Sequence, residues 1–197
     1  YIVKVDWPDY GSSYDWHSPV NYFNGYYLDL NYQYEYPDRE DITGYQETYI
    51  QDFVSDFELA LIGNNYKDIV NGYRKYIDVH SFADYFILNE IANNVDAYRL
   101  SNFFTKVAGS KGGKLFEGPI WDFNLGFGNA NYGNAWLTSG WALYNPDVTA
   151  VIPFHLKRLR QDPAFTGLVY CRWNNLRTNL LSDEHINVLI DSLTTYL

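Results

Sequence analysis

Two acidic loops contain the residues of this chain that are best suited to chemistry. The first loop, residues 89–96, places Asn93 and Asp96 at the end of a helical pattern. The second loop, residues 118–124, reads Gly-Pro-Ile-Trp-Asp-Phe-Asn and contains Asp122 and Asn124. Carboxylate and amide oxygens bind divalent cations, and a carboxylate also orients a hydroxyl nucleophile. These residue types therefore suit phosphoryl transfer, which needs both functions at one site.

A predicted β-hairpin brings the two loops together. Residues 102–107 and 114–118 have the composition of short strands, and the glycine-rich stretch 109–113 between them favours a reversal of the chain. Because the outer ends of a hairpin lie side by side, Asp96 and Asp122 are expected at the same end of the ribbon. The structural alternatives are a turn residue for Asp96 and a turn cap for Asp122.

The elements before the hairpin follow from composition, periodicity and helix-end signals. Residues 1–5 and 26–30 are predicted strands, and the stretch 8–25 between them is a predicted loop. Aromatic and aliphatic residues recur at helical spacing from Thr43, and Gly63 ends this pattern. The sequence therefore predicts a small β element followed by a helix of about five turns.

The helices near and beyond the loops also have recognisable starts. Ser81 with Asp84 resembles a capping box, and the helix that it predicts runs into the first acidic loop. Further helices are predicted from Asp162-Pro163 and from Ser182. Cys171, the only cysteine, is predicted to be a buried thiol in the first of these. Taken together, these elements predict a mixed α+β fold that is mainly helical in its second half.

The motifs of the two loops resemble the CotH kinase family, atypical protein kinases related to spore coat protein H. The resemblance rests on Asn-Glu-x-x-x-Asn-x-Asp-x-Tyr-Arg-x-Ser from residue 89 and on Gly-Lys-Leu-x-x-Gly-Pro-x-Trp-Asp-Phe-Asn-Leu-x-Phe-Gly-Asn from residue 113. It extends over roughly residues 36–181. It implies an atypical protein-kinase-like fold: one domain over residues 1–197, with a β-rich segment 1–36 and a helical core 37–197 that contains a catalytic hairpin at 101–124.

The resemblance also implies roles for individual residues. Asp96 is the expected catalytic aspartate, and Asp122 with Asn124 is the expected site for Mg²⁺, or for Mn²⁺ or Ca²⁺. Asn124 stands where many CotH-like sequences have a second aspartate. ATP is the expected phosphoryl donor, and a serine or threonine of a protein is the expected acceptor. Further candidates for nucleotide or substrate binding are Asn93, Arg99, Asn102 and Lys106. Their alternative roles are backbone caps for the two asparagines and exposed charges for Arg99 and Lys106.

The family's upstream arginine–glycine–asparagine motif is not found in this sequence. Lys4, on the first predicted strand, is the only early lysine and the candidate for a remnant of the nucleotide lobe. We therefore expect the chain to lack part of the N-terminal nucleotide lobe. This departure keeps open a first alternative function, a non-catalytic extracellular module of the same fold. Such a module would bind a peptide or a glycan through aromatic side chains, in which the first 36 residues are rich.

Net charge and hydropathy argue against some partners and against a membrane-spanning segment. The chain has 14 Lys and Arg against 24 Asp and Glu, a net charge of −10, which argues against nucleic acid and anionic membrane surfaces as partners. No apolar stretch is long enough for a transmembrane segment, and no signal peptide is recognised. Resemblance and composition together predict a bacterial extracellular or cell-surface protein. A glycoside hydrolase using Asp96 and Asp122 is a second alternative; it requires carboxyl groups about 5 Å or 6.5–9.5 Å apart.

Overall fold

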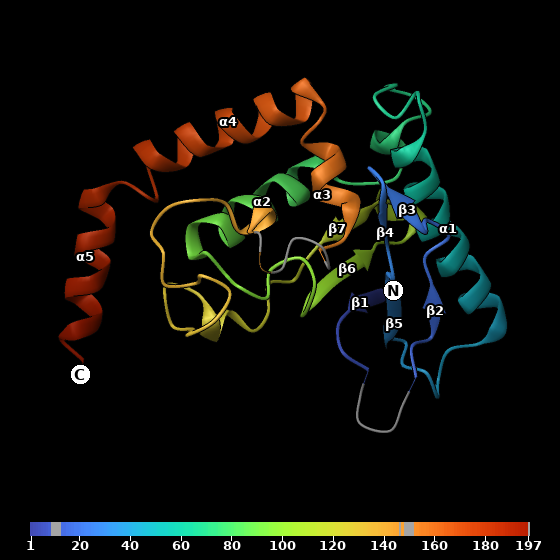
Figure 1. Ribbon diagram of the computed structural model, residues 1–197, viewed down its shortest axis with the longest axis horizontal. Coiled ribbons are helices and arrows are strands. Elements are labelled where there is room, and N and C mark those ends of the chain that lie inside the picture. Colours follow the sequence, from blue (N-terminus) through green and yellow to red (C-terminus); the bar gives the residue numbers. More distant parts are fainter. Residues whose placement is uncertain (9–12, 146, 148–151, 197) are drawn as a thin grey trace.

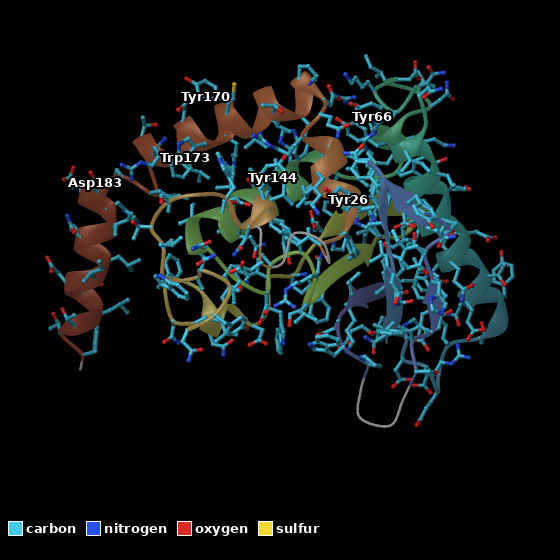
Figure 2. All side chains as sticks on the ribbon, in the orientation of Figure 1. Tyr26, Tyr66, Tyr144, Tyr170, Trp173 and Asp183 are labelled. Carbon is cyan, nitrogen blue, oxygen red and sulfur yellow. The ribbon has the colours of Figure 1, made fainter. Side chains whose placement is uncertain are left out.

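The computed structural model describes residues 1–8, 13–145, 147 and 152–196 and shows a mixed α+β fold. An antiparallel sheet and helix α1 (Gly44–Ile62) occupy one end of the molecule, and helices α4 (Pro163–Thr178) and α5 (Asp183–Thr194) extend to the other end (Figure 1). Figure 2 places Trp173 on α4 and Asp183 at the start of α5 in this extension. The predicted α+β class is confirmed.

The main sheet joins the N-terminal segment to the predicted hairpin. Its strand order is β2-β5-β1-β6-β7, and all neighbouring strands are antiparallel. The strands are β1 (Ile2–Val5), β2 (Trp16–His17), β5 (Asn31–Tyr36), β6 (Asn102–Lys106) and β7 (Leu115–Glu117). Strands β6 and β7 form the expected hairpin. The sequence did not predict that β1 lies between β5 and β6, so that the N-terminal strands and the hairpin belong to one sheet.

The predicted strand at residues 26–30 and the predicted loop at 8–25 are partly wrong. A small hairpin, β3 (Tyr22–Phe23) with β4 (Tyr26–Tyr27), occupies this region, and the long strand starts later, at β5. The turn of the small hairpin is Asn24-Gly25, with both residues at positive φ (52° and 84°). Asn-Gly is the pair that two-residue hairpin turns favour, because both positions tolerate the left-handed conformation.

Helix α1 agrees with its prediction. Thr43 is the N-cap and forms a capping box with Gln46, and the helix ends before Gly63. Ile50, Phe57 and Leu61 are among the side chains on its buried face. These side chains belong to the hydrophobic core that also receives residues from the sheet and from the other helices.

Helix α2 (Val79–Ala92) starts three residues earlier than predicted. The N-cap is Asp78, whose side chain accepts a hydrogen bond from the Ser81 backbone N–H at 2.9 Å. The predicted Ser81–Asp84 capping pair is therefore wrong. Asp84 instead binds Arg172 of α4 through two hydrogen bonds of 2.7 and 3.1 Å, and this clamp holds α4 against α2.

The C-terminal helices begin where their cap residues predict. Asp162 caps α4, with Pro163 in the first turn, and Ser182 caps α5. Cys171 is exposed, so the predicted buried thiol is wrong. The reason is that α4 buries only Phe165 and Val169 among its described residues, which leaves most of the helix surface in water.

A buried polar network ties the sheet to the helices within the core. Glu58 of α1 is fully buried, and its carboxylate accepts hydrogen bonds from the Ser18 Oγ at 2.6 Å and from the Tyr32 hydroxyl at 2.7 Å. The same carboxylate lies 2.7 Å from Nε2 of His155, which belongs to helix α3 (Phe154–Leu159). Burial, followed by the charge of Glu58, raises the pKa of Tyr32 well above its usual value, so this hydroxyl stays a donor.

Short 3₁₀ turns complete the described structure: η1 (Tyr73–Lys75), η2 (Gly109–Lys111), η3 (Phe123–Leu125) and η4 (Ala142–Tyr144). Turns η3 and η4 belong to the long segment that follows the hairpin, which contains no strand or α-helix in its described part. Among the described helices, none has the length and apolar character that crossing a membrane requires.

Candidate active site

The asparagines of the first acidic loop hold its backbone in place. Asn93 ends α2 in the left-handed conformation (φ 43°), and its Nδ2 donates to the carbonyl oxygens of Ala135 (3.2 Å) and Leu137 (3.0 Å). Asn94 is buried, and its Oδ1 accepts a hydrogen bond from the Asp96 N–H at 3.3 Å. These contacts position the loop, so the side chain of Asn93 serves the backbone in this structure.

Asp96 follows these asparagines and is held by two side chains. Its Oδ1 accepts a hydrogen bond from Nη2 of Arg99 at 2.5 Å, and the hydroxyl of Tyr132 lies 3.3 Å from Oδ1 and 3.4 Å from Oδ2. The side chain of Asp96 keeps 18% exposure, and that of Arg99 keeps 13%. Burial, followed by the charge of Asp96, raises the pKa of Tyr132. Asp96 is therefore an oriented carboxylate that a substrate can still reach.

The second acidic loop is anchored to the first. The Phe127 N–H donates to the carbonyl oxygen of Ala92, the last residue of α2, at 2.6 Å. Gly126 lies so close to Ala92 that an added Cβ would approach the Ala92 Cβ to 3.2 Å. Asp122 and Asn124 occupy the stretch directly before this anchor, and both are exposed. The hairpin and this anchor thus bring the two loops side by side, as the sequence indicated.

Non-glycine residues with positive φ are concentrated in the acidic loops and in the segments that follow them. Seven non-glycine residues in the described part of the chain have positive φ, and six of them lie between residues 93 and 134. They are Asn93 (43°), Tyr98 (71°), Ser101 (49°), Asp122 (57°), Phe127 (55°) and Asn134 (54°). Such residues are uncommon, and strained conformations cluster at functional sites, where the surrounding structure holds them. Asn93 and Asp122 lie in the two acidic loops, and the other four residues lie in the segments that follow them.

Asn102 and Lys106 lie in different places on β6. Asn102, at the end of the strand nearest the loops, is buried; its Nδ2 donates to the Tyr98 carbonyl oxygen at 3.1 Å. Its Oδ1 is buried without a hydrogen-bond partner. Lys106, at the opposite end of the strand, is buried with its Nζ 3.1 Å from the Tyr49 hydroxyl and 4.3 Å from the centre of the Phe53 ring. The structure therefore does not bring Lys106 to the acidic loops.

Two residues of this region received no individual role from the sequence. Tyr132, which contacts Asp96, lies in the irregular segment after the hairpin, where no spacing rule links it to that residue. Glu90 is mostly buried and accepts hydrogen bonds from the Tyr98 hydroxyl and the Ala142 N–H, both at 2.7 Å. Burial raises the pKa of Glu90. Glu90 therefore ties the segment around η4 to the loop that follows Asp96.

A cleft of about 610 Å³ opens beside Arg99 and Tyr132. Its other walls come from the N-terminal strands and their connections, which include Asp6 and Asp29, and from the residues before α3, which include Asp147. Among the described lining residues, the carboxylates outnumber Arg99, the one cation. A polyphosphate would enter such a cleft with its charge balanced by a divalent cation.

The oxygen donors of the second loop fit a magnesium ion whose coordination is completed by other groups. Among the described residues, no three His, Cys, Asp or Glu side chains form a ready-made metal site. Mg²⁺ is usually held by one or two carboxylates together with waters and substrate phosphates. The exposed Asp122 carboxylate and Asn124 amide match that pattern.

Comparison with known proteins decides the family. A family model described as CotH kinase protein matches residues 21–197. The chain belongs to the CotH kinase family. The match covers nearly the whole chain, more than the motifs alone indicated, and CotH membership indicates a kinase-like function. No curated protein and no solved structure matches the chain. The kinase-like arrangement of the fold therefore stays a prediction for this CotH protein, whereas its α+β class is observed.

Proposed function

We propose that this CotH-family chain transfers the γ-phosphoryl group of ATP to a serine or threonine hydroxyl of a protein, with Mg²⁺ as the metal. The observation that supports this best is the strained pair of loops, which places an arginine-bound aspartate (Asp96) and an exposed aspartate (Asp122) at one end of the β6–β7 hairpin. Phosphoryl transfer requires little more from a protein than such positioning and charge.

Asp96 is the residue that orients the acceptor hydroxyl. Its Oδ1 is engaged by Arg99, while the one contact of Oδ2 among the described residues is with the Tyr132 hydroxyl at 3.4 Å. Oδ2 is therefore the oxygen that accepts the hydrogen bond, and then the proton, of the acceptor hydroxyl. The hydroxyl oxygen forms the new bond to the γ-phosphorus while the bond to the β,γ-bridging oxygen breaks, and ADP leaves.

Asp122 and Asn124 are the residues that would hold the metal. A Mg²⁺ ion held there would supply the positive charge that offsets the negative charge developing during transfer. Asn124 contributes an amide oxygen where a carboxylate would bind more strongly, so we expect modest metal affinity without nucleotide. Arg99 adds a fixed positive charge at the wall of the cleft, where we place the nucleotide.

Calorimetric titration tests the metal and nucleotide site. Mg²⁺, and then ATP with Mg²⁺, is titrated into the wild-type protein and into Asp122→Ala. We expect binding by the wild type and at least tenfold weaker binding by the variant. Asp52→Ala is the matched control, because Asp52 is an exposed aspartate of α1 and its loss changes the net charge equally. Equal binding by all three proteins would refute the role of Asp122, and an absence of binding by the wild type would favour a non-catalytic module.

Transfer of radioactive phosphate from ATP to serine- and threonine-containing peptide libraries tests the role of Asp96. Asp96→Asn keeps the shape of the side chain but accepts a proton poorly. We expect transfer to fall by roughly 10²–10⁴-fold in this variant, with the affinity for Mg²⁺ and ATP retained. Unchanged transfer in Asp96→Asn would exclude Asp96 as the group that orients the hydroxyl.

A further inference from the structure

Phe127 combines strong exposure with a strained backbone. It stands between Gly126 and Gly128, adopts φ 55°, and keeps 76% of its surface exposed. A bulky aromatic residue in the left-handed region is an outlier, because its Cβ crowds the backbone there. Glycine adopts this conformation without that cost and occupies the next position, Gly128, at φ 80°.

The fold does not account for the aromatic ring at this position. The contact that anchors the turn is the bond from the Phe127 N–H to the Ala92 carbonyl oxygen, which any residue except proline could make. The ring itself buries little surface, so it contributes little hydrophobic stabilisation. A strained residue that the fold does not need points to contact with a ligand.

The position of Phe127 indicates which ligand the ring meets. Ile120 and Trp121, at 51% and 64% exposure, precede Asp122, and Phe127 follows Asn124 by three residues. Exposed apolar side chains therefore flank the expected metal ligands on both sides in sequence. The ring is exposed directly after the second acidic loop, on a surface that a protein acceptor can reach.

We propose that Phe127 is a specificity-determining residue that contacts an apolar side chain of the protein substrate close to the serine or threonine acceptor. This inference rests on the proposed kinase function and names the class of acceptor sequence that the site prefers. An aromatic ring offers rigid apolar surface to aliphatic and aromatic side chains without fixing their orientation. Such a contact favours acceptor peptides with an apolar residue by roughly 10-fold or more over those with a polar residue.

An oriented peptide library tests the preference. Serine- and threonine-centred peptides, each with one fixed apolar, polar or charged residue near the acceptor, are phosphorylated with ATP and Mg²⁺ by the wild type and by Phe127→Gly. We expect the wild type to prefer an apolar residue at one fixed position. In Phe127→Gly this preference should be lost, with KM for ATP unchanged.

Two controls keep loss of the fold apart from loss of the contact. Glycine fits φ 55°, so Phe127→Gly should unfold at the wild-type temperature or above it. Tyr45→Ala removes an exposed aromatic side chain from α1 and should leave the peptide preference unchanged. This inference would be overturned if the wild type transferred phosphate without preferring an apolar residue, or if Phe127→Gly kept the same preference. Either result would leave the proposed kinase function standing. A higher KM for ATP in Phe127→Gly would also overturn this inference, because the ring would then serve the nucleotide. No transfer by the wild type would refute both proposals.

Discussion

Replacing Glu58 by alanine should strongly destabilise the protein, because this residue joins the sheet to the helices. Its buried carboxylate on α1 accepts hydrogen bonds from Ser18 and from Tyr32 of β5, and it also binds His155 of α3. Glu58→Ala removes the acceptor that these groups share and leaves them in a place that water does not reach. The variant therefore measures how much this buried network contributes to the free energy of unfolding.

The magnitude follows from the number of groups that lose their partner. One buried polar group without a partner costs about 1–3 kcal/mol, and Ser18, Tyr32 and His155 all lose their partner in Glu58→Ala. Because these effects overlap, we expect Glu58→Ala to lose about 4 kcal/mol of a total of roughly 5–15 kcal/mol. Glu58→Gln keeps the volume and one acceptor oxygen, so its loss should be about 1–2 kcal/mol.

Urea unfolding at pH 7.5, followed by circular dichroism, measures these losses. With a slope of about 2 kcal/mol per molar urea, the midpoint of Glu58→Ala should fall by about 2 M, and that of Glu58→Gln by less than 1 M. Glu40→Ala removes an exposed glutamate and should unfold at the same urea concentration as the wild type. If Glu58→Ala lost less than about 1 kcal/mol of the free energy of unfolding, the buried network would not stabilise the fold, and the buried groups left without a partner would cost less than expected.

Three further predictions concern other parts of the molecule. Burial raises the pKa of Glu117 well above its usual value in the folded protein. The protonated side chain therefore contributes fully to the free energy of unfolding below about pH 4.3, the pKa of Glu in the unfolded chain, and this contribution is lost as the pH rises through the folded pKa. The advantage of Glu117→Gln over the wild type in melting temperature should therefore grow from pH 4.5 to pH 8.5, and an advantage independent of pH would contradict this. Arg172→Ala breaks the half-exposed clamp to Asp84 and should lower the free energy of unfolding by only about 0.5–1 kcal/mol in the same urea assay; a loss above about 2 kcal/mol would show that the clamp is more than a surface pair. Cys171 should react with a thiol reagent in the native protein, and a requirement for denaturant would contradict its exposure.

The sequence predicted best what is determined locally. Helix α1 and the starts of α4 and α5 agree with the structure, because Thr43, Asp162 and Ser182 cap the helices through bonds to nearby backbone N–H groups. The start of α2 was misplaced because Asp78 and Ser81 are both good caps, and only the fold shows that Asp84 is committed to Arg172. Local capping signals do not identify the N-cap reliably when a residue of the pattern binds a distant partner instead.

The candidate site was predictable in its loops but not in its supporting contacts. Hairpin geometry was enough to bring the two acidic loops together, since it depends on the turn and the strands alone. The contact of Tyr132 with Asp96 joins residues that no regular element relates. The burial of Lys106 against Tyr49 and Phe53 likewise depends on how α1 packs on the sheet, which periodicity does not reveal.

The central position of β1 has a consequence for biosynthesis. Ile2 of β1 pairs with Thr105 of β6, so β1 leaves the ribosome about 100 residues before this partner strand. At about 5–20 residues per second, that delay lasts roughly 5–20 s, during which one edge of β1 has no strand to bond with. Such distant pairing slows folding and exposes an edge to other chains. We therefore expect nascent chains of this protein to depend on protection of β1 until the hairpin has been synthesised.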